Sequence, residues 1–356
     1  MTLDDLVHSP GEWLATGGPL SDVVVSSRIR IARNLTGFHF LSKTGPGEPG
    51  EIERALFEAI SACEFGRDTF YVDIDKSDDL DRQFLVERHL ISRQHAEGQG
   101  NRGVAISNAE TLALMINEED HLRVQVLRRG MNLDEAWNEM TRVDTALESV
   151  VDFAYHKQYG YLTACPTNVG TGLRVSVMLH LPALKVTNEI EKVFRAAKEM
   201  RLAVRGLYGE GTDALGDFFQ VSNQVTLGQT EDEILSGFKE NVIPSIVRYE
   251  QETRRALKQD KLTALDDRVW RALGLLENAR AISSEEALFL LSHLRMGVVL
   301  GRISHIDLEA INELFMAAQS AHLQKRRGQR LDGERRSIVR ADLIRDRLGG
   351  TAPSEN

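Results

Sequence analysis

A change in residue pattern near residue 255 constrains the fold of this 356-residue chain more than any other feature of its sequence. Before that point, short alternating apolar stretches recur between helical stretches, and several are spaced closely enough to form hairpins. This mixture favours an α+β domain with a largely antiparallel sheet over residues 1–255. Beyond it only helical periodicity remains, and no proline occurs between Pro244 and Pro353. We therefore expect an all-helical second domain over residues 256–350, followed by a disordered tail at 351–356.

Local patterns predict individual elements. The alternation of Leu122, Val124 and Val126 predicts a strand, because successive side chains of a strand face opposite sides of the sheet. Asn132 and Glu135 have the spacing of a capping box, which predicts the start of a helix. Similar patterns predict strands at 104–106, 111–116, 173–181, 202–208 and 218–227, helices at 51–60 and 189–199, and helix starts at Thr230, Ser283 and Ser304.

Composition limits the classes of function open to the chain. The net charge of −10 argues against general nucleic-acid binding, although a basic stretch lies between His322 and Arg347. No apolar run approaches the roughly 18–20 residues that span a bilayer, and no signal sequence is evident. The two cysteines, Cys63 and Cys165, suit neither a disulfide framework nor a zinc site. We expect a cytoplasmic protein that binds neither nucleic acid nor a membrane directly.

The strongest candidate for chemistry is the run at 165–174, whose sequence is CPTNVGTGLR. It places Cys165 near two threonine hydroxyls and Arg174, a setting that favours an ionised thiol. Its glycines allow backbone amides to come close to an anion, and the arginine fork suits phosphate or carboxylate. The alternative is a buried structural cysteine in a turn, which is the commoner fate of a lone cysteine.

Four further arginines stand where a strand or loop would present them. Arg28 and Arg30 are two residues apart, so an extended segment would point both toward the same face. Arg123 falls in an alternating stretch, and Arg205 opens a glycine-rich one. Together with Arg174 they can form the cage that phosphoryl transfer needs, because that catalysis is mostly positioning and charge stabilisation. Taken singly, each is better explained as a surface charge.

Two acidic segments complete the set. Glu119 lies in the sequence NEED at 117–120, and Glu210 lies in RGLYGEG at 205–211. Two carboxylates and a thiolate can hold a planar guanidinium through its N–H donors. One carboxylate can also accept a proton as the nitrogen attacks phosphorus. The alternatives are an acidic turn between strands and a surface loop.

Together these segments resemble the ATP:guanido phosphotransferase (phosphagen kinase) family. The matching stretches are SSRIRIARN at 26–34, NEEDHLR at 117–123, CPTNVGTGLR at 165–174 and RGLYGEG at 205–211, in the family's order. The resemblance implies a guanido kinase catalytic domain with a mainly antiparallel sheet flanked by helices. It also implies ATP as cosubstrate, with Mg²⁺ carried by the nucleotide and no metal site in the protein itself.

The same resemblance implies roles for individual residues. Cys165 would align the guanidino group, while Glu119 would orient it and act as base, with Glu210 as its partner. His89 would contact the nucleotide, and the phosphates would be bound by Arg28, Arg30, Arg123, Arg174 and Arg205. Further nucleotide contacts would come from Ser26, Ser27, Ile29, Val175, Ser176, Val177, Met178, Gly206, Leu207, Tyr208 and Gly209.

The domain order is similar to that of the bacterial protein-arginine kinases of this family. Small-molecule guanidino kinases carry a covering helical domain before the first motif, whereas 25 residues precede it here. In the bacterial enzymes a helical C-terminal domain mediates dimerisation and binds phosphoarginine through an Arg-Asp-x-x-Arg-Ala motif. The corresponding residues here are Arg336, Ser337, Arg340 and Ala341, with Ser337 in place of the aspartate. Arg336 and Arg340 are four apart and would share a helix face, as a phosphate clamp requires.

On this resemblance we expect an ATP-dependent kinase that phosphorylates protein arginines, forms a homodimer and acts in the stress response. Its expected partners are a heat-shock transcriptional repressor that it inactivates, a zinc-binding activator protein and an AAA+ unfoldase-protease that degrades the marked proteins. Two alternatives stay open. One is a kinase for free arginine or another small guanidine, and the other is a catalytically dead module that reads phosphoarginine.

Overall fold

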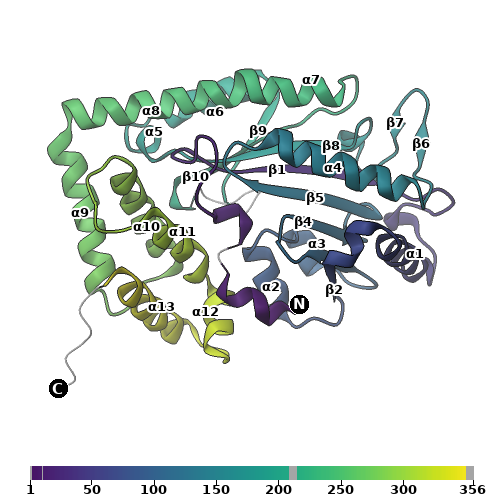
Figure 1. Ribbon diagram of the computed structural model, residues 1–356, viewed down its shortest axis with the longest axis horizontal. Coiled ribbons are helices and arrows are strands. Elements are labelled where there is room, and N and C mark those ends of the chain that lie inside the picture. The colour runs from purple at the N-terminus through teal and green to yellow at the C-terminus, as the bar shows by residue number, and fades with distance from the viewer. Residues whose placement is uncertain (1, 10, 208–214, 350–356) are drawn as a thin grey trace.

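The computed structural model describes residues 2–9, 11–207 and 215–349, and its centre is an eight-stranded sheet (Figure 1). The strand order is β2-β3-β4-β5-β1-β8-β10-β9, and every neighbouring pair is antiparallel. The expected α+β fold is therefore confirmed. The strands are β1 Val24–Arg33, β2 Thr69–Asp73, β3 Gly103–Ser107, β4 Leu112–Ile116, β5 Leu122–Arg129, β8 Leu173–His180, β9 Leu202–Arg205 and β10 Phe218–Asn223; β6 Tyr155–His156 and β7 Gly160–Tyr161 form a separate hairpin.

Two of the expected strands end earlier than their patterns predict. Strands β9 and β10 end at Arg205 and Asn223 rather than at residues 208 and 227. The side chain of Asn223 donates to Leu173 O and accepts from Val175 N at 2.8 Å, so it takes over the backbone groups of β8 that another strand residue would pair. The structure also contains strands β1 and β2, which were not among the strands predicted from the sequence patterns.

One face of the sheet carries the main hydrophobic core. The side chains of Ile29, Val126 and Val177 are fully buried there. Because side chains alternate along each strand, the opposite face of the same strands is left for polar groups. The core is completed by helices α1 Glu48–Ala62, α4 Leu133–Glu148, α6 Ile190–Glu199, α7 Glu231–Ser236 and α8 Ile243–Asp260, so that the helices expected at 51–60 and 189–199 are confirmed.

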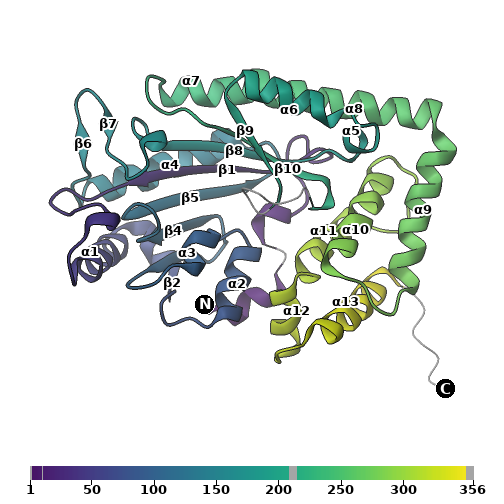
Figure 2. The same cartoon turned by 180° about the vertical axis from the view of Figure 1, so that it is seen from behind.

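The chain after α8 is helical, and this region lies at the end of the sheet away from the β6–β7 hairpin, as Figure 2 shows from behind. Its helices are α9 Leu262–Asn278, α10 Ser284–Val299, α11 Leu308–Ala317, α12 Ser320–Arg327 and α13 Gly333–Leu348. The expected boundary at 255/256 falls inside α8, so the division into two domains stays a prediction. The expected tail at 351–356 lies outside the described residues. Among the helices that are described, none is long and apolar enough to cross a membrane.

The helix starts predicted from capping patterns have mixed outcomes. Thr230 caps α7 in a reciprocal box, and Ser283 caps α10 by accepting from the third residue of the helix. The start at Ser304 is wrong, because α11 begins at Leu308 with Asp307 as its N-cap. Helix α4 does follow Asn132, but that side chain donates to Arg129 O at 2.9 Å and makes no capping bond.

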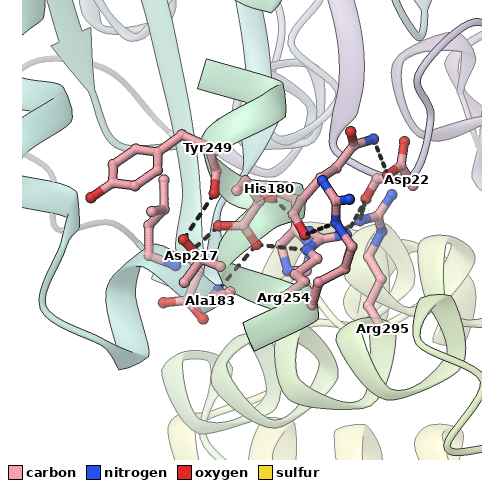
Figure 3. Close-up of polar contacts among 12 residues, drawn as sticks. Asp22, His180, Ala183, Asp217, Tyr249, Arg254 and Arg295 are labelled. Carbon is pink, nitrogen blue, oxygen red and sulfur yellow. Dashed lines mark hydrogen bonds and ion pairs between the residues drawn. The ribbon is translucent and has the colours of Figure 1, made fainter. Parts of the chain in front are cut away.

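A buried polar network joins the helical region to the sheet (Figure 3). Arg295 of α10 donates to Ser21 O at 2.8 Å, and its Nη1 lies 2.8 Å from Nδ1 of His180 at the end of β8. Because a guanidinium only donates, Nδ1 of His180 accepts and the ring proton sits on Nε2. That Nε2 lies 2.9 Å from Oγ of Ser292, which in turn donates to Asp217 at 2.7 Å. The network therefore fixes the end of β8 and the residue that precedes β10.

Glu250 of α8 is a second acidic member of this network, besides Asp217, and is fully buried. It accepts from the backbone amides of Ala183 and Leu184, at the start of α5 Pro182–Val186, and from Arg254 Nε at 2.7 Å. Arg254 donates onward to His180 O at 3.0 Å. One carboxylate thus satisfies three donors that would otherwise be buried without partners.

We expect Glu250→Ala to lower the free energy of unfolding by about 3–5 kcal/mol, because it leaves a buried guanidinium without its counter-charge and two buried amides without an acceptor. Asp267→Ala is the matched control, since Asp267 and Arg271 form an arginine–carboxylate pair at the same helical spacing but well exposed to solvent. The control should cost about 0.5 kcal/mol or less. Urea unfolding followed by circular dichroism compares the two, and equal losses would contradict the account.

Candidate active site

The pairing register of β1 gathers four arginines on one face of the sheet. Arg28, Arg30 and Ala32 alternate along β1 and therefore share a face. Arg30 lies directly opposite Arg174 of β8, and Ala32 lies opposite Arg123 of β5. Directly opposite residues of an antiparallel pair point to the same side of the sheet. All four guanidinium groups are therefore on the face away from the main core.

The fifth arginine joins them through the outer strands. Arg205 of β9 lies opposite Gln220 of β10, which lies opposite Met178 of β8. Met178 lies opposite Ser26, which is two residues before Arg28 on β1. The five residues Arg28, Arg30, Arg123, Arg174 and Arg205 are called the arginine face below.

The members of the arginine face repel one another. Burial, followed by the charges of Arg123, Arg174 and Arg205, lowers the pKa of Arg28 to about 9. Burial and the neighbouring arginines likewise hold the pKa of Arg30 well below its usual range. Arg28 donates to the side chain of Gln220, so a neutral group holds this cation. A surface with several converging guanidinium groups is a binding site for a polyanion.

Four of the residues expected to contact a nucleotide turn away from this face. Ile29, Val175 and Val177 are fully buried in the main core on the other side of the sheet. Ser27 is also buried, and its hydroxyl donates to Gly130 O at 2.8 Å. Because alternate residues of a strand face opposite sides, any contact of these four with a ligand on the arginine face is restricted to backbone atoms.

A carboxylate that the sequence did not single out neutralises one arginine. Glu118 is 7% exposed, and both of its oxygens accept from Arg123 Nη1 at 2.8 Å. Burial alone would raise the pKa of Glu118, but the charge of Arg123 and hydrogen bonds from Ser92 and Arg123 hold that pKa at about 2. Arg123 is thereby fixed in position. In the sequence, the feature that could have identified Glu118 is its position next to Glu119 in the segment NEED.

Glu119 is in a different electrostatic setting from its neighbour. It is only partly buried, and burial together with the charges of Asp120 and Glu118 raises its pKa. The charges of Arg123 and Arg174 oppose this shift without cancelling it. A carboxylate with a raised pKa is a better proton acceptor near neutral pH than an ordinary glutamate.

Asp120 connects Glu119 to the segment that carries Cys165. Its Oδ1 accepts from Ala164 N and from Asn34 Nδ2, both at 2.6 Å. Asn34 also donates to Leu162 O at 3.0 Å. The end of β1, the acidic turn and the residues before Cys165 are therefore held as one unit. The sequence motifs place these residues far apart along the chain, so only the fold reveals this link.

The thiol of Cys165 is partly exposed, and its Sγ lies 3.0 Å from the hydroxyl of Thr167. The glycines that follow have a packing role in addition to any contact with an anion. Gly170 and Gly172 have φ of 114° and 66°, and a Cβ on them would lie 2.8 Å from Thr226 O and 2.7 Å from Ala32 O. The glycines thus let the run pack directly onto neighbouring backbone.

His89 borders the arginine face in a left-handed backbone conformation, with φ of 58°. The residues just before it are anchored by the helical region. Glu87 accepts from the backbone amide and Nδ1 of His322 in α12, at 3.1 and 2.9 Å. Arg88 donates to Glu110 at 2.6 Å, and its Nη1 lies 3.2 Å from Nε2 of His322. Burial and the charges of Arg28 and Arg30 lower the pKa of His89 to about 3, so its ring is neutral at neutral pH.

The glycine-rich segment after β9 is described only in part. Gly206 and Leu207 are buried, and Leu207 packs with the apolar core of the helical region. Tyr208, Gly209 and Glu210 lie outside the described residues, so the structure does not test their expected roles.

Of the two arginines on α13 that we expect to bind phosphoarginine, one is buried. Arg340 is 2% exposed and donates to Ala318 O at 2.7 Å and to Ile282 O at 2.8 Å. Burial, followed by the charge of Arg336, lowers its pKa to about 10. Ala341 is fully buried. Arg340 therefore ties α13 to the end of α11 and to the residue before the N-cap of α10, and its role in binding phosphoarginine stays a prediction.

The other residues of this motif are closer to solvent. Arg336 is partly exposed, and its Nη1 donates to Leu331 O at 2.9 Å. Ser337 donates back to Gly333 O at 3.1 Å, within its own helix. Within the described ranges, no group of three or more His, Cys, Asp or Glu side chains has the geometry to hold a metal ion.

Known proteins with similar sequences span nearly the whole chain. The family model of the ATP:guanido phosphotransferase C-terminal catalytic domain matches residues 51–253, and that of the protein-arginine kinase McsB C-terminal domain matches residues 262–356. A protein-arginine kinase of Halothermothrix orenii is 44% identical over 350 residues, covering 98% of this chain and 99% of its own. A protein-arginine kinase of Desulforamulus reducens is 45% identical over 98% of both chains.

Solved structures of guanidino kinases share the fold over about 70% of this chain. The duplicated taurocyamine kinase of Schistosoma mansoni, with bound transition-state-analogue components, has a TM-score of 0.60 at 26% identity; the match covers 70% of this chain and 36% of that one. A lombricine kinase has a TM-score of 0.59 at 25% identity, covering 72% of this chain and 77% of its own.

The raised pKa of Glu119 gives a pH prediction. If its carboxylate accepts a proton, kcat/KM falls as the pH drops through the pKa of the free enzyme, and this limb lies above the value of about 4.3 for an ordinary glutamate. The profile is measured with circular dichroism as a check on folding at each pH. Glu119→Gln should abolish activity across the range. An acid limb at or below 4.3 in folded protein would contradict the assignment.

Proposed function

This chain belongs to the protein-arginine kinases of the ATP:guanido phosphotransferase family, and we propose that its arginine face binds ATP beside an acceptor site formed by Glu119 and Cys165. The observation that carries the proposal is the convergence of five guanidinium groups on one sheet face, next to a carboxylate with a raised pKa. A triphosphate would neutralise the positive charge of the arginine face, and a guanidinium would neutralise the negative charge of the carboxylate.

The positions along β1 suggest the direction in which the substrates lie. Asn34, just beyond the end of β1, is tied to Asp120 and hence to the segments of Glu119 and Cys165. Arg30 and Arg28 follow in the direction of the strand's start. The arginine side chain of a protein substrate would enter at the Asn34 end, with the γ-phosphate nearest to it. Mg²⁺ would accompany the nucleotide phosphates.

The proposed phosphoryl transfer is a single displacement at the γ-phosphorus of ATP. A nitrogen of the substrate guanidinium forms a bond to the γ-phosphorus of ATP, and the bond from that phosphorus to the bridging oxygen of ADP breaks. The nitrogen loses a proton, which the carboxylate of Glu119 accepts. Cys165, as thiolate, holds the guanidinium in line, assisted by the hydroxyl of Thr167. Glu210 would supply the second carboxylate, an assignment that rests on the sequence motif.

The division into a catalytic domain at 1–255 and a helical domain at 256–350 is part of the proposal. For the helical domain we propose dimerisation and phosphoarginine binding, supported by the match of residues 262–356 to the C-terminal domain of protein-arginine kinases. Since Arg340 is committed to carbonyl oxygens, Arg336 would be the residue that contacts the phosphate.

The cellular role is proposed on the family resemblance. The kinase would act in the cytoplasm during the stress response, inactivating a heat-shock transcriptional repressor and marking proteins for an AAA+ unfoldase-protease. A zinc-binding activator protein would stimulate it. The support for protein substrates is that relatives matching the whole chain are named protein-arginine kinases.

The acceptor is tested by supplying ATP and Mg²⁺ with an arginine-containing protein and with free arginine in parallel. We expect acid-labile phosphate on protein arginines, located by mass spectrometry, and little transfer to free arginine. Transfer to free arginine alone would contradict the assignment and favour a small-molecule kinase. No transfer to either acceptor, with the activator present, would favour a module that only binds phosphoarginine.

Cys165→Ala should lower kcat by at least about 100-fold while the fold stays intact, because the thiolate positions the guanidinium and does not support the core. Cys63→Ala is the matched control, since that cysteine is buried at the end of α1 among core residues. The control should cost stability but retain most activity. Initial rates and thermal unfolding are measured for both variants. A fully active Cys165→Ala enzyme would refute the role of the thiolate.

Arg336→Ala should weaken phosphoarginine binding about tenfold, the usual scale of one charge-assisted hydrogen bond to a phosphate. Arg335→Ala is the control, since Arg335 is adjacent in sequence but exposed. Isothermal titration calorimetry with free phosphoarginine gives both affinities. Unchanged affinity in Arg336→Ala would rule out this residue as the phosphate contact.

A further inference from the structure

A buried cation at the end of β1 has no role in the proposed transfer. Arg33 is the last residue of that strand and is 3% exposed. Because side chains alternate along a strand, Arg33 leaves the sheet on the side opposite to Arg30 and Ala32, toward the main core. It therefore does not face the phosphates. A buried guanidinium is costly unless its donors are satisfied, so its contacts show which parts of the fold it joins.

Helix α4 supplies the counter-charge of Arg33. Asp144 of that helix accepts from Nε of Arg33 at 3.1 Å and from Nη2 at 2.6 Å, so the two side chains form a two-point ion pair. Such a pair fixes the plane of the guanidinium as well as its position. Met140 and Leu147 anchor α4 in the main core, where both are fully buried. The orientation of Arg33 is therefore set by a helix that is packed into the core.

The third nitrogen of the guanidinium binds the run that follows Cys165. Nη1 of Arg33 donates to Thr171 O and to Ala32 O, both at 3.0 Å. Thr171 lies between the two glycines of the run, and a Cβ on Gly172 would lie 2.8 Å from Nη1. The run thus packs directly against the guanidinium, and its backbone is hydrogen-bonded to it.

The ring of Tyr161 covers the same guanidinium. The central carbon of the Arg33 guanidinium lies 3.4 Å from the centroid of that ring, within the range of a cation–π contact. The hydroxyl of Tyr161 donates to Glu148 at the end of α4, and its backbone exchanges hydrogen bonds with Gly170 at 2.8 and 3.3 Å. Arg33 and Tyr161 therefore tie the run to α4 by two routes.

The position of the Cys165 thiol depends on how this run is held on both sides. Before the cysteine the chain is bound by Asp120, and after it by Arg33. Between these anchors lies one 3₁₀ turn, Pro166–Asn168, with Cys165 as its N-cap. A displacement of about 1 Å at a reacting centre can lower a rate about 100-fold. An anchor that never touches the thiol can therefore control the rate through it.

We propose that Arg33 is a positioning residue of the acceptor site: it transfers the fixed position of α4 to the run at 165–172 and thereby holds Cys165 in line with the substrate guanidinium. This inference rests on the proposed role of the Cys165 thiolate. It assigns to Arg33 a part in the reaction although its side chain lies on the opposite side of the sheet from the phosphates.

Arg33→Lys keeps the positive charge but loses the planar fork that binds Asp144 and Thr171 O together. We expect kcat to fall about tenfold or more, because the thiolate is displaced, while the Kd for ATP stays unchanged, because the arginine face is intact. In a Cys165→Ala background the same substitution should change kcat by less than about twofold, since no thiolate is left to misplace. Initial rates with radiolabelled ATP give kcat for the four proteins, and calorimetry gives the affinities.

Arg254→Lys is the matched control. Arg254 is 2% exposed and is paired with the carboxylate of Glu250, but it lies near the start of β1 rather than beside the acceptor. Thermal unfolding should show a loss of stability in both lysine variants. Only Arg33→Lys should lower kcat, so the control separates the position of the thiolate from stability in general.

A second variant leaves Arg33 itself in place. Asp144→Asn removes the counter-charge and one of the two acceptor oxygens, at nearly the same side-chain volume. We expect kcat to fall in the same direction, and again only in protein that retains Cys165. This variant decides the question if Arg33→Lys does not fold.

The outcomes separate this inference from the proposed function. A fully active Cys165→Ala enzyme would refute the role of the thiolate, and with it the proposed acceptor site. An active-site thiolate that is confirmed, with unchanged kcat in Arg33→Lys and Asp144→Asn, would overturn the role of Arg33 alone. The same factor of loss with and without Cys165 would also overturn it, since Arg33 would then act independently of the thiolate.

Discussion

The mutual repulsion of five arginines on one face of a sheet is the constraint around which the rest of this structure is arranged. Burial and the neighbouring charges lower the pKa of Arg28 and Arg30, and Glu118 forms a direct ion pair with Arg123. The arrangement persists because the other face of the same strands is packed with fully buried apolar side chains. The core thus offsets the repulsion, and the face is preorganised for a polyanion before it arrives.

Strand β1 gives the site its direction, and contacts from the helical region fix the end of the site near the start of β1. Near the start of β1, Arg295 and Arg254 bind the backbone of the preceding residues. Beside the site, Glu87 and His322 join α2 Asp79–Glu87 to α12 just before His89. At the far end, Asp120 and Asn34 hold the segment of Cys165, and Asp144 of α4 binds Arg33 at the end of β1. The acceptor side and the nucleotide side of the site are therefore supported by different parts of the fold.

The sequence alone was enough to identify those residues of the candidate site that lie in short local motifs. The spacing of Arg28 and Arg30 predicts a shared face because a strand alternates, and the register confirms it. The same alternation excludes contacts between a nucleotide and the side chains of Val175 and Val177. The resemblance had implied contacts from both, because they lie just after a matching motif. The ion pair of Glu118, the link through Asp120 and the burial of Arg340 depend on contacts between distant segments.

The central claim is that the triphosphate lies along the arginine face, from the Cys165 end toward the start of β1. X-ray diffraction from crystals grown with a non-hydrolysable ATP analogue and an arginine-containing peptide tests it most directly. The account predicts phosphates against Arg28, Arg30, Arg123, Arg174 and Arg205, and the peptide guanidinium between Glu119 and Cys165. A nucleotide bound in the reverse direction, or away from this face, would contradict it.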